Sequence, residues 1–234
     1  MSKGVLYLIP VPLGEESLPQ QVLPAQVTEV INKVSEFITE DARSARRFLK
    51  KAGYNKSLNE LVMHSIGKHA AEDRSAYLAA AEKGMDIGLL SEAGCPGVAD
   101  PGSDIVRMAH EKNIRVVPLT GPSSILLALM ASGFNGQSFC FHGYLPIDKH
   151  DRSRKIKNME RDAREKKQTQ IFIETPFRNE QLFSELVQNC DASTLLCIAC
   201  DISLPAEFIQ THKIGYWKNT KPALHKRPAV FLIG

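Results

Sequence analysis

The stretch VLYLIPVPLG, residues 5–14, joins a run of five apolar residues to a turn that contains two prolines and a glycine. The unbroken apolar run predicts a buried strand from Val5 to Ile9, because a strand covered on both faces shows no alternation. Proline cannot donate to a sheet ladder, so the strand must end at Pro10. A buried strand followed by a stiff turn is typical of an open parallel sheet, where ligands bind beyond the carboxyl ends of the strands.

The same arrangement of strand and turn occurs twice more along the chain. Met85 to Ser91 predicts a buried strand that leads into a loop of glycine, proline and small residues at 91–102. Ile114 to Pro118 predicts another strand, and a similar loop follows at 120–124. Glycine lets the backbone approach a ligand closely and proline stiffens it. Each loop alone is more simply an ordinary tight turn, but three in sequence order favour one shared ligand site.

Helical patterns lie between these strands. Apolar residues at 27, 30, 31 and 34 have helical spacing, and a short strand at Phe37–Ile38 precedes a second helix from Asp41 to Gly53. A further helix is expected to begin at Ser103 as its N-cap, and another runs from Ile125 to Ala131. Alternating strands and helices predict a largely parallel sheet with helices on both faces.

The sequence changes character after Gly133. Strands are expected at 139–143, 171–174, 195–202, 208–212 and 229–233, with one clear amphipathic helix around Leu182 to Val187. This half therefore predicts a mixed sheet with fewer helices. We place the boundary between Pro118 and Gly136, and assign residues 1–120 to an N-terminal α/β domain and residues 121–234 to a C-terminal α/β domain.

Composition excludes several classes of protein. The 234 residues are 43% hydrophobic and 24% charged, which is ordinary for a globular chain, and a net charge of +3 does not by itself indicate a nucleic-acid partner. The apolar run near the N-terminus is too short for a signal-peptide core. The uncharged stretch from Val116 to Ile147 is interrupted by glycines, so it does not predict a membrane span. We expect a soluble, cytoplasmic protein.

The five cysteines, at positions 95, 140, 190, 197 and 200, have no framework spacing and an odd count. This pattern indicates free thiols in a reducing compartment. Cys197 and Cys200 form a CxxC pair, but a zinc site needs a second pair or histidines at ligand spacing. We interpret the run Leu195 to Cys200 as a buried strand in which cysteine acts as a small apolar residue, and we expect no metal.

Several short motifs together resemble a known family, whereas neither GxGxxG nor GxxxxGK[ST] marks a nucleotide site. The motifs are PVPLG at 10–14, EDAR at 40–43, SEAGCP at 91–96, ADPG at 99–102, GPSS at 121–124, FHGYLP at 141–146 and ETPFR at 174–178. In order and spacing they resemble the tetrapyrrole-methylase superfamily. Within it they most resemble the small-subunit ribosomal RNA cytidine 2'-O-methyltransferases, although the match ends at Gly234 without the C-terminal extension of that branch.

The resemblance implies two α/β domains with S-adenosylmethionine in the cleft between them, and a homodimer. It also implies methylation of a ribose hydroxyl of ribosomal RNA. A small tetrapyrrole-like molecule or a protein as acceptor, and an inactive RNA-binding relative, remain as alternatives. By motif, the cofactor would contact Pro12, Gly14, Gly94, Cys95, Val98, Ala99, Asp100, Ser123, Ser124, Phe141, Leu145 and Leu204.

This chain departs from the family pattern at several positions. Glu15 follows the first-loop glycine where the family has Asn, and Phe177 replaces a histidine. Glu92 and Cys95 stand in place of Asp and Thr in the central loop. The segment from Met63 to His69 replaces a His-Glu-His-Asn-rich segment. These changes lie on the expected acceptor side.

Methyl transfer to a hydroxyl requires a general base within hydrogen-bond reach of the proton. The acidic candidates are Glu40, Asp41, Asp100 and Glu174. Asp100 could instead cap the helix that follows it, and Glu174 could pair with Arg178 as a structural link.

The predicted helix from Asp41 to Gly53 has two distinct faces. Ala42, Ala45, Leu49 and Ala52 form its apolar stripe, whereas Arg43, Arg46, Arg47, Lys50 and Lys51 share the other face. Five cations on one face suit a phosphate backbone, although a solvated face is the simpler alternative. Arg43, Arg46, Arg47 and Arg178 are the substrate-binding candidates. The basic segment from Lys149 to Lys167 also contains acidic residues, so it is more typical of a salt-bridged surface.

Overall fold

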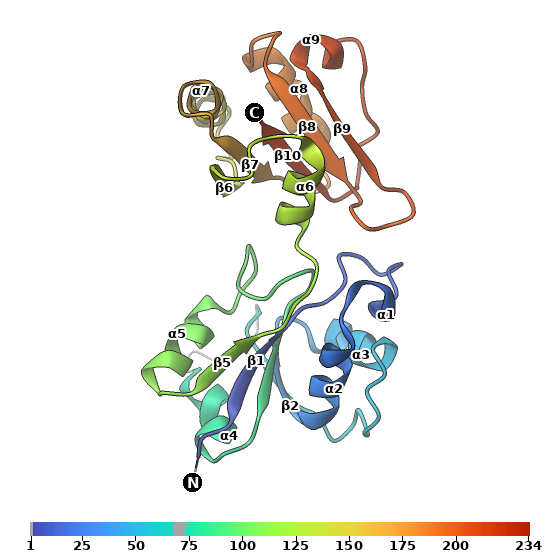
Figure 1. Ribbon diagram of the computed structural model, residues 1–234, viewed down its shortest axis with the longest axis vertical. Coiled ribbons are helices and arrows are strands. Elements are labelled where there is room, and N and C mark those ends of the chain that lie inside the picture. Colours follow the sequence, from blue (N-terminus) through green and yellow to red (C-terminus); the bar gives the residue numbers. More distant parts are fainter. Residues whose placement is uncertain (1, 68–73) are drawn as a thin grey trace. The chain divides into compact units, whose positions relative to one another are not determined.

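The computed structural model describes residues 2–67 and 74–234, and His69 lies outside this range. The chain divides into two compact units, Met1–Ser123 and Ser124–Gly234 (Figure 1). Each unit contains one five-stranded sheet. The predicted two-part α/β fold is therefore confirmed, whereas the assignment of residues 1–120 and 121–234 to separate domains stays a prediction.

The first unit is built on a sheet whose strands all pair in parallel, in the order β3-β2-β4-β1-β5. β1 has the bounds that the apolar run at 5–9 predicts. The strands are β1 (Val5–Ile9), β2 (Glu36–Thr39), β3 (Val62–Ser65), β4 (Ile87–Leu90) and β5 (Arg115–Pro118).

Helices cover both faces of this sheet. Leu6 of β1 packs into a core with residues from α4 and α5, whereas Ile9 of the same strand packs with residues from α2 and α3. Burial on both faces explains why the strand sequences lack alternation. The helices of this unit are α1 (Pro19–Val22), α2 (Ala25–Lys33), α3 (Ala42–Lys51), the short 3-10 helix η1 (Ser75–Leu78), α4 (Ala79–Glu82) and α5 (Ser103–Glu111).

The sheet of the second unit is mixed, as the sequence predicts. Its order is β6-β7-β10-β8-β9; β6 and β7 pair in parallel, and the remaining neighbours pair antiparallel. The strands are β6 (Phe139–Tyr144), β7 (Thr169–Ile173), β8 (Leu195–Cys200), β9 (Phe208–Lys213) and β10 (Ala229–Ile233). Both cysteines of the CxxC pair are fully buried in β8, which confirms their interpretation as apolar strand residues.

Four helices complete the second unit. α6 (Ser124–Ser132) packs on β8, β9 and β10, while α7 (Lys149–Lys166) and α8 (Asn179–Asn189) pack on each other. α9 (Ile214–Trp217) supplies Trp217 to a core that also contains Phe172 and Phe231. None of the helices that the structure describes is long and apolar enough to cross a membrane.

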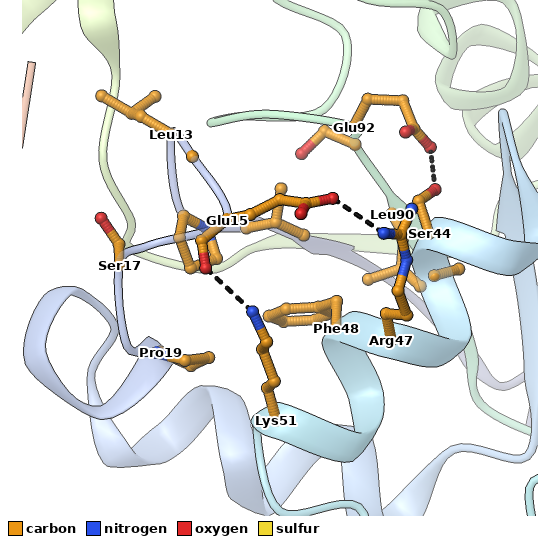
Figure 2. A pocket seen from close by; sticks show the side chains of 15 residues that line it. Leu13, Glu15, Ser17, Pro19, Ser44, Arg47, Phe48, Lys51, Leu90 and Glu92 are labelled. Carbon is orange, nitrogen blue, oxygen red and sulfur yellow. Dashed lines mark hydrogen bonds and ion pairs between the residues drawn. The ribbon is translucent and has the colours of Figure 1, made fainter. Parts of the chain in front are cut away.

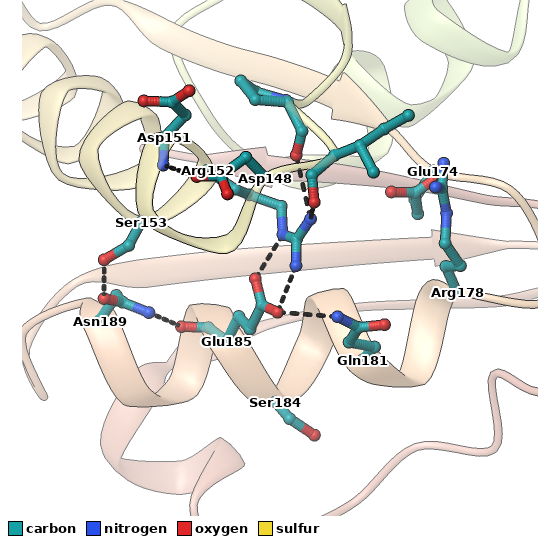
Figure 3. Close-up of polar contacts among 12 residues, drawn as sticks. Asp148, Asp151, Arg152, Ser153, Glu174, Arg178, Gln181, Ser184, Glu185 and Asn189 are labelled. Atoms are coloured by element: carbon teal, nitrogen blue, oxygen red, sulfur yellow. Dashed lines mark hydrogen bonds and ion pairs between the residues drawn. The ribbon is translucent and has the colours of Figure 1, made fainter.

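The charged helix α7 is a salt-bridged surface along most of its length, as expected. Arg154 pairs with Asp151 and Lys166 pairs with Asp162 in the exposed part of the helix. Arg152 is an exception, because it is 5% exposed and forms a bidentate ion pair with Glu185 of α8 (Figure 3).

The prediction that Ser103 caps α5 is wrong, because Ser103 is the first helical residue and Gly102 occupies the N-cap without any side-chain bond. Gly102 has φ +125°, a conformation that only glycine adopts readily. A Cβ atom there would also lie 2.8 Å from Cδ2 of Leu89. The chain therefore turns from the central loop into α5 at the glycine.

Candidate functional site

The three predicted loops lie at one edge of the first unit's sheet. β4, β1 and β5 are neighbours and run parallel, so their carboxyl ends point the same way. The loops that follow these strands begin at Pro10, Ser91 and Leu119. The topology therefore brings together three segments that are far apart in the sequence, at the edge where open α/β sheets bind ligands.

Direct contacts hold these loops together. The backbone N–H of Val11 donates to the carbonyl of Gly94 at 2.9 Å, and the N–H of Gly94 donates back at 3.1 Å. The thiol of Cys95 donates to the carbonyl of Pro122 at 3.4 Å. Gly121 lies against Pro10 so closely that a Cβ atom would be 2.3 Å from Cγ of that proline. The predicted convergence of the loops is confirmed.

The central loop has a fixed and strained shape. The buried hydroxyl of Ser91 donates to the carbonyl of Gly94 at 2.6 Å, which closes the first turn. Gly94 has φ +72°, and Ala99 has φ +57° although it carries a side chain. A left-handed residue other than glycine costs about 1–2 kcal/mol and persists only where its surroundings hold it. The loop is therefore a preformed surface.

An acidic group borders this loop. Burial, followed by the nearby carboxylate of Glu40 and then that of Glu92, raises the pKa of Asp100 to about 6. The Asp100 carboxylate accepts a hydrogen bond from the backbone N–H of Glu92. No ion pair among the residues 2–67 and 74–234 includes any of these three carboxylates. The group therefore suits a cationic ligand.

The structure decides between alternative roles for two of the acidic candidates. Asp41 is the N-cap of α3, because its carboxylate accepts from the N–H groups of Arg43 at 2.7 Å and Ser44 at 2.9 Å. Those backbone hydrogen bonds, first that of Ser44, lower the pKa of Asp41. Asp100 does not cap α5, since that helix has no side-chain cap. Its carboxylate is directed instead to the group with Glu40 and Glu92.

Glu174 and Arg178 form the structural link that was the alternative to a catalytic Glu174. The Glu174 side chain is buried, and its Oε1 accepts from Nε of Arg178 at 3.0 Å and from Nη2 at 2.6 Å. The same oxygen accepts from the N–H of Thr175 at 2.6 Å. Both candidates are thus engaged with each other in the second unit. A role for Glu174 in catalysis or Arg178 in substrate binding stays a prediction.

The remaining cofactor candidates divide between the two units. In the first unit, Pro12, Gly14, Gly94, Cys95, Val98, Ala99, Asp100 and Ser123 all lie on the three loops. In the second unit, Ser124 begins α6, Phe141 lies in β6, and Leu204 follows β8. Leu145 is 3% exposed and packs in the core of the second unit. Their contact with a cofactor stays a prediction.

The basic face predicted for α3 is present. Ala45, Leu49 and Ala52 are buried, whereas Arg43, Arg46, Arg47, Lys50 and Lys51 are exposed. A cavity of about 330 Å³, which the sequence did not predict, lies between this helix and the first loop (Figure 2). Glu15 spans it, since its Oε1 lies 2.9 Å from Nη1 of Arg47 and its carbonyl accepts from Nζ of Lys51 at 2.8 Å.

The fold is that of an α/β protein in which three rigid loops meet at the carboxyl edge of a parallel sheet. The chain belongs to the family of tetrapyrrole (corrin/porphyrin) methylases, which it matches over residues 5–215. The predicted methyltransferase with S-adenosylmethionine as donor is thereby confirmed.

Relatives and solved structures agree with this assignment. "Ribosomal RNA small subunit methyltransferase I" of Escherichia coli O157:H7 is 32% identical over 92% of this chain and 71% of the relative. The protein of the same name from Buchnera aphidicola subsp. Schizaphis graminum is 28% identical over 98% of this chain and 78% of the relative.

Two solved structures share the fold at low sequence identity. The methyltransferase CobJ superimposes with a TM-score of 0.65 at 18% identity, over 99% of this chain and 94% of that chain. Uroporphyrin-III C-methyltransferase from Thermus thermophilus, complexed with S-adenosyl homocysteine, superimposes with a TM-score of 0.60 at 17% identity. The match covers 99% of this chain and 97% of that chain.

Replacing Gly121 by alanine is expected to weaken S-adenosylmethionine binding about tenfold, since overpacking of about 1–3 kcal/mol would separate the first and third loops. Isothermal titration calorimetry measures the Kd. Gly136→Ala is the matched control, because a Cβ atom there meets no heavy atom within 4 Å. An unchanged Kd in a folded Gly121→Ala variant would show that the contact with Pro10 does not shape the donor site.

Proposed function

We propose that this protein methylates a ribose hydroxyl of small-subunit ribosomal RNA, with S-adenosylmethionine as donor. The observation that carries the proposal is the position of the acidic group. The backbone N–H of Asp41, the N-cap of α3, donates to Oε1 of Glu92 at 3.3 Å, and the Ser44 hydroxyl donates to the same oxygen at 2.7 Å. The carboxylates thus border the helix whose exposed face carries five cations. The names of the relatives support ribosomal RNA as the acceptor.

The chain's residues supply alignment and proton transfer. When bound, S-adenosylmethionine supplies a methyl group on a cationic sulfur, so the donor is already activated. The rigid loops hold the reactants in line, and such positioning can lower a barrier by about 7–11 kcal/mol. Asp100 accepts the proton of the attacking hydroxyl, because a carboxylate with a raised pKa is a stronger base than an ordinary one. Burial, and after it the negative charges of Glu40 and Glu92, maintain that raised pKa.

The proposal includes two features that the resemblance implied. A homodimer is the expected assembly, and a ribosomal acceptor would place the protein in the cytoplasm. Sedimentation of the purified chain tests the first of these, because a monomer of 25.9 kDa and a dimer sediment differently.

Transfer of a radiolabelled methyl group to ribosomal subunits tests the proposed function. Small subunits from a strain that lacks the protein are expected to accept label from S-adenosylmethionine, and those from the parent strain are not, because their site is already methylated. Nuclease digestion should recover the label in a 2'-O-methylated nucleoside. Label in a ribosomal protein, or S-adenosylmethionine binding without any transfer to RNA, would reject the ribose acceptor in favour of another substrate or an inactive relative.

A further inference from the structure

The cavity between the first loop and α3 has an apolar base and a charged rim. Val11, Ala45 and Leu90 are at most 5% exposed and form its base, while half-buried Phe48 lies beside them. The rim carries two cations of α3 together with the carboxylates of Glu15 and Glu92 (Figure 2). Its volume of about 330 Å³ is at the lower end for small-molecule sites. An apolar body with one anionic group fits this lining.

The carboxylate of Glu15 occupies the position beside Arg47 where an anionic ligand would bind. The Glu15 carboxylate lies 2.9 Å from the Arg47 guanidinium, which is where a phosphate oxygen would bind. The side chains of Arg47 and Glu15 are 58% and 79% exposed. Ion pairs between side chains this exposed contribute little to stability. A competing anion can therefore displace the carboxylate readily.

We propose that this cavity is a nucleotide subsite for the RNA acceptor, in which a phosphate displaces Glu15 from Arg47. The inference rests on the proposed function and adds the residues that bind the acceptor. The nucleobase of the bound nucleotide lies on the apolar bottom of the cavity, next to Phe48, because aromatic side chains stack on nucleobases of any sequence. The ammonium of Lys51, which donates to the Glu15 carbonyl in this structure, lies beside the phosphate position. Glu15, which stands where the family motif has Asn, acts as a competing anion that lowers RNA affinity.

Removal of the Glu15 charge tests the proposal. Glu15→Gln is expected to bind fluorescein-labelled oligocytidylate about two- to fivefold more tightly, as the loss of one exposed ion pair implies. Its affinity should also fall more steeply with salt, by about 0.7 in the log–log slope, because Arg47 then binds a mobile counterion that RNA releases. Fluorescence anisotropy measures both quantities. Glu16→Gln is the matched control, because Glu16 is adjacent and exposed but does not line the cavity.

A double-mutant cycle distinguishes competition between Glu15 and RNA for Arg47 from the general effect of removing one negative charge. In an Arg47→Gln background the gain from Glu15→Gln should disappear, since the competition acts through Arg47. A gain of the same size in both backgrounds, or one equal to that of Glu16→Gln, overturns the subsite. A change in S-adenosylmethionine affinity without a change in RNA affinity would also overturn it, because the cavity would then serve the donor.

The proposed function and the nucleotide subsite can be disproved separately. If wild-type protein methylates ribosomal subunits but Glu15→Gln leaves oligocytidylate affinity unchanged, the subsite is wrong and the proposed function stands. If wild-type protein neither binds the RNA nor transfers methyl to subunits, both are wrong.

Discussion

Asp100→Asn is expected to lower kcat for methyl transfer by about 10²–10⁴-fold, the usual contribution of a general base. Asparagine keeps the shape of the side chain and cannot accept the hydroxyl proton. The affinity for S-adenosylmethionine should fall less, because Glu40 and Glu92 continue to provide negative charge. Radiolabel transfer to ribosomal subunits gives kcat, and calorimetry gives the Kd of the donor. Glu111→Gln serves as the control, since it removes a carboxylate from the exposed surface of α5.

The pH dependence of the wild-type rate provides a second test of Asp100. The base must be ionised, so kcat/KM, which reports the free enzyme, should rise as the pH increases through about 6 and then reach a plateau. The residual rate of Asp100→Asn should show no such rise. A wild-type profile that is flat between pH 5 and 8, roughly the range in which this carboxyl titrates, would contradict its role as base.

Stability distinguishes a catalytic Asp100 from a structural one. Its pKa is raised in the folded protein, so the charged form is disfavoured there and stability is lost as the pH rises through about 6. Asp100→Asn removes that charge, and its Tm should exceed that of wild type at about pH 8 but not at about pH 4, where the wild-type carboxyl is protonated as well. A lower Tm at the higher pH would indicate that the carboxylate stabilises the loop.

Much of the candidate site could be predicted because its sequence signals are local. The five apolar residues at 5–9 gave the bounds of β1, and the glycines and prolines after β1, β4 and β5 marked the loops that converge. β3 was missed because, among the described strands, it pairs only with β2, and none of its residues is buried, Val62 being 49% exposed. The cavity was missed because it lies between the first loop and α3, which are separate in the sequence and which no local pattern brings together.

The burial of Arg152 could have been predicted from its spacing in the sequence. Charge composition indicated a solvated, salt-bridged surface from Lys149 to Lys167. Arg152 nevertheless falls in helical step with Ile156, Met159 and Ala163, the buried residues of α7. A cation that shares the phase of an apolar stripe faces the core, and it then needs a buried partner. Glu185, in the apolar stripe of α8, is that partner.

Truncation of either member of this ion pair is expected to destabilise the protein by about 3–5 kcal/mol, because it leaves an uncompensated buried charge. The side chains of Arg152 and Glu185 are 6% and 8% exposed, and two hydrogen bonds of 2.5 Å join them. The guanidinium also donates to the carbonyls of Pro146 and Ile147, so the pair fixes the turn before α7 (Figure 3). Urea denaturation of Arg152→Ala and Glu185→Ala measures the free energy of unfolding. The exposed ion pair of Arg154 with Asp151 gives the control, because Arg154→Ala should lower that free energy by at most about 1 kcal/mol.

The same pair predicts a pH dependence and a rescue. The hydrogen bonds from Arg152 lower the pKa of Glu185, so the stability it contributes is present above the unfolded pKa and is lost as the pH falls through the folded one. The stability difference between wild type and Glu185→Ala should therefore narrow in acid. Arg152→Met combined with Glu185→Leu should recover most of the loss, since apolar residues of similar volume replace buried ion pairs at little cost. If the double variant is as unstable as the single ones, the contacts of Arg152 with the carbonyls before α7, rather than its charge pairing, account for the lost stability.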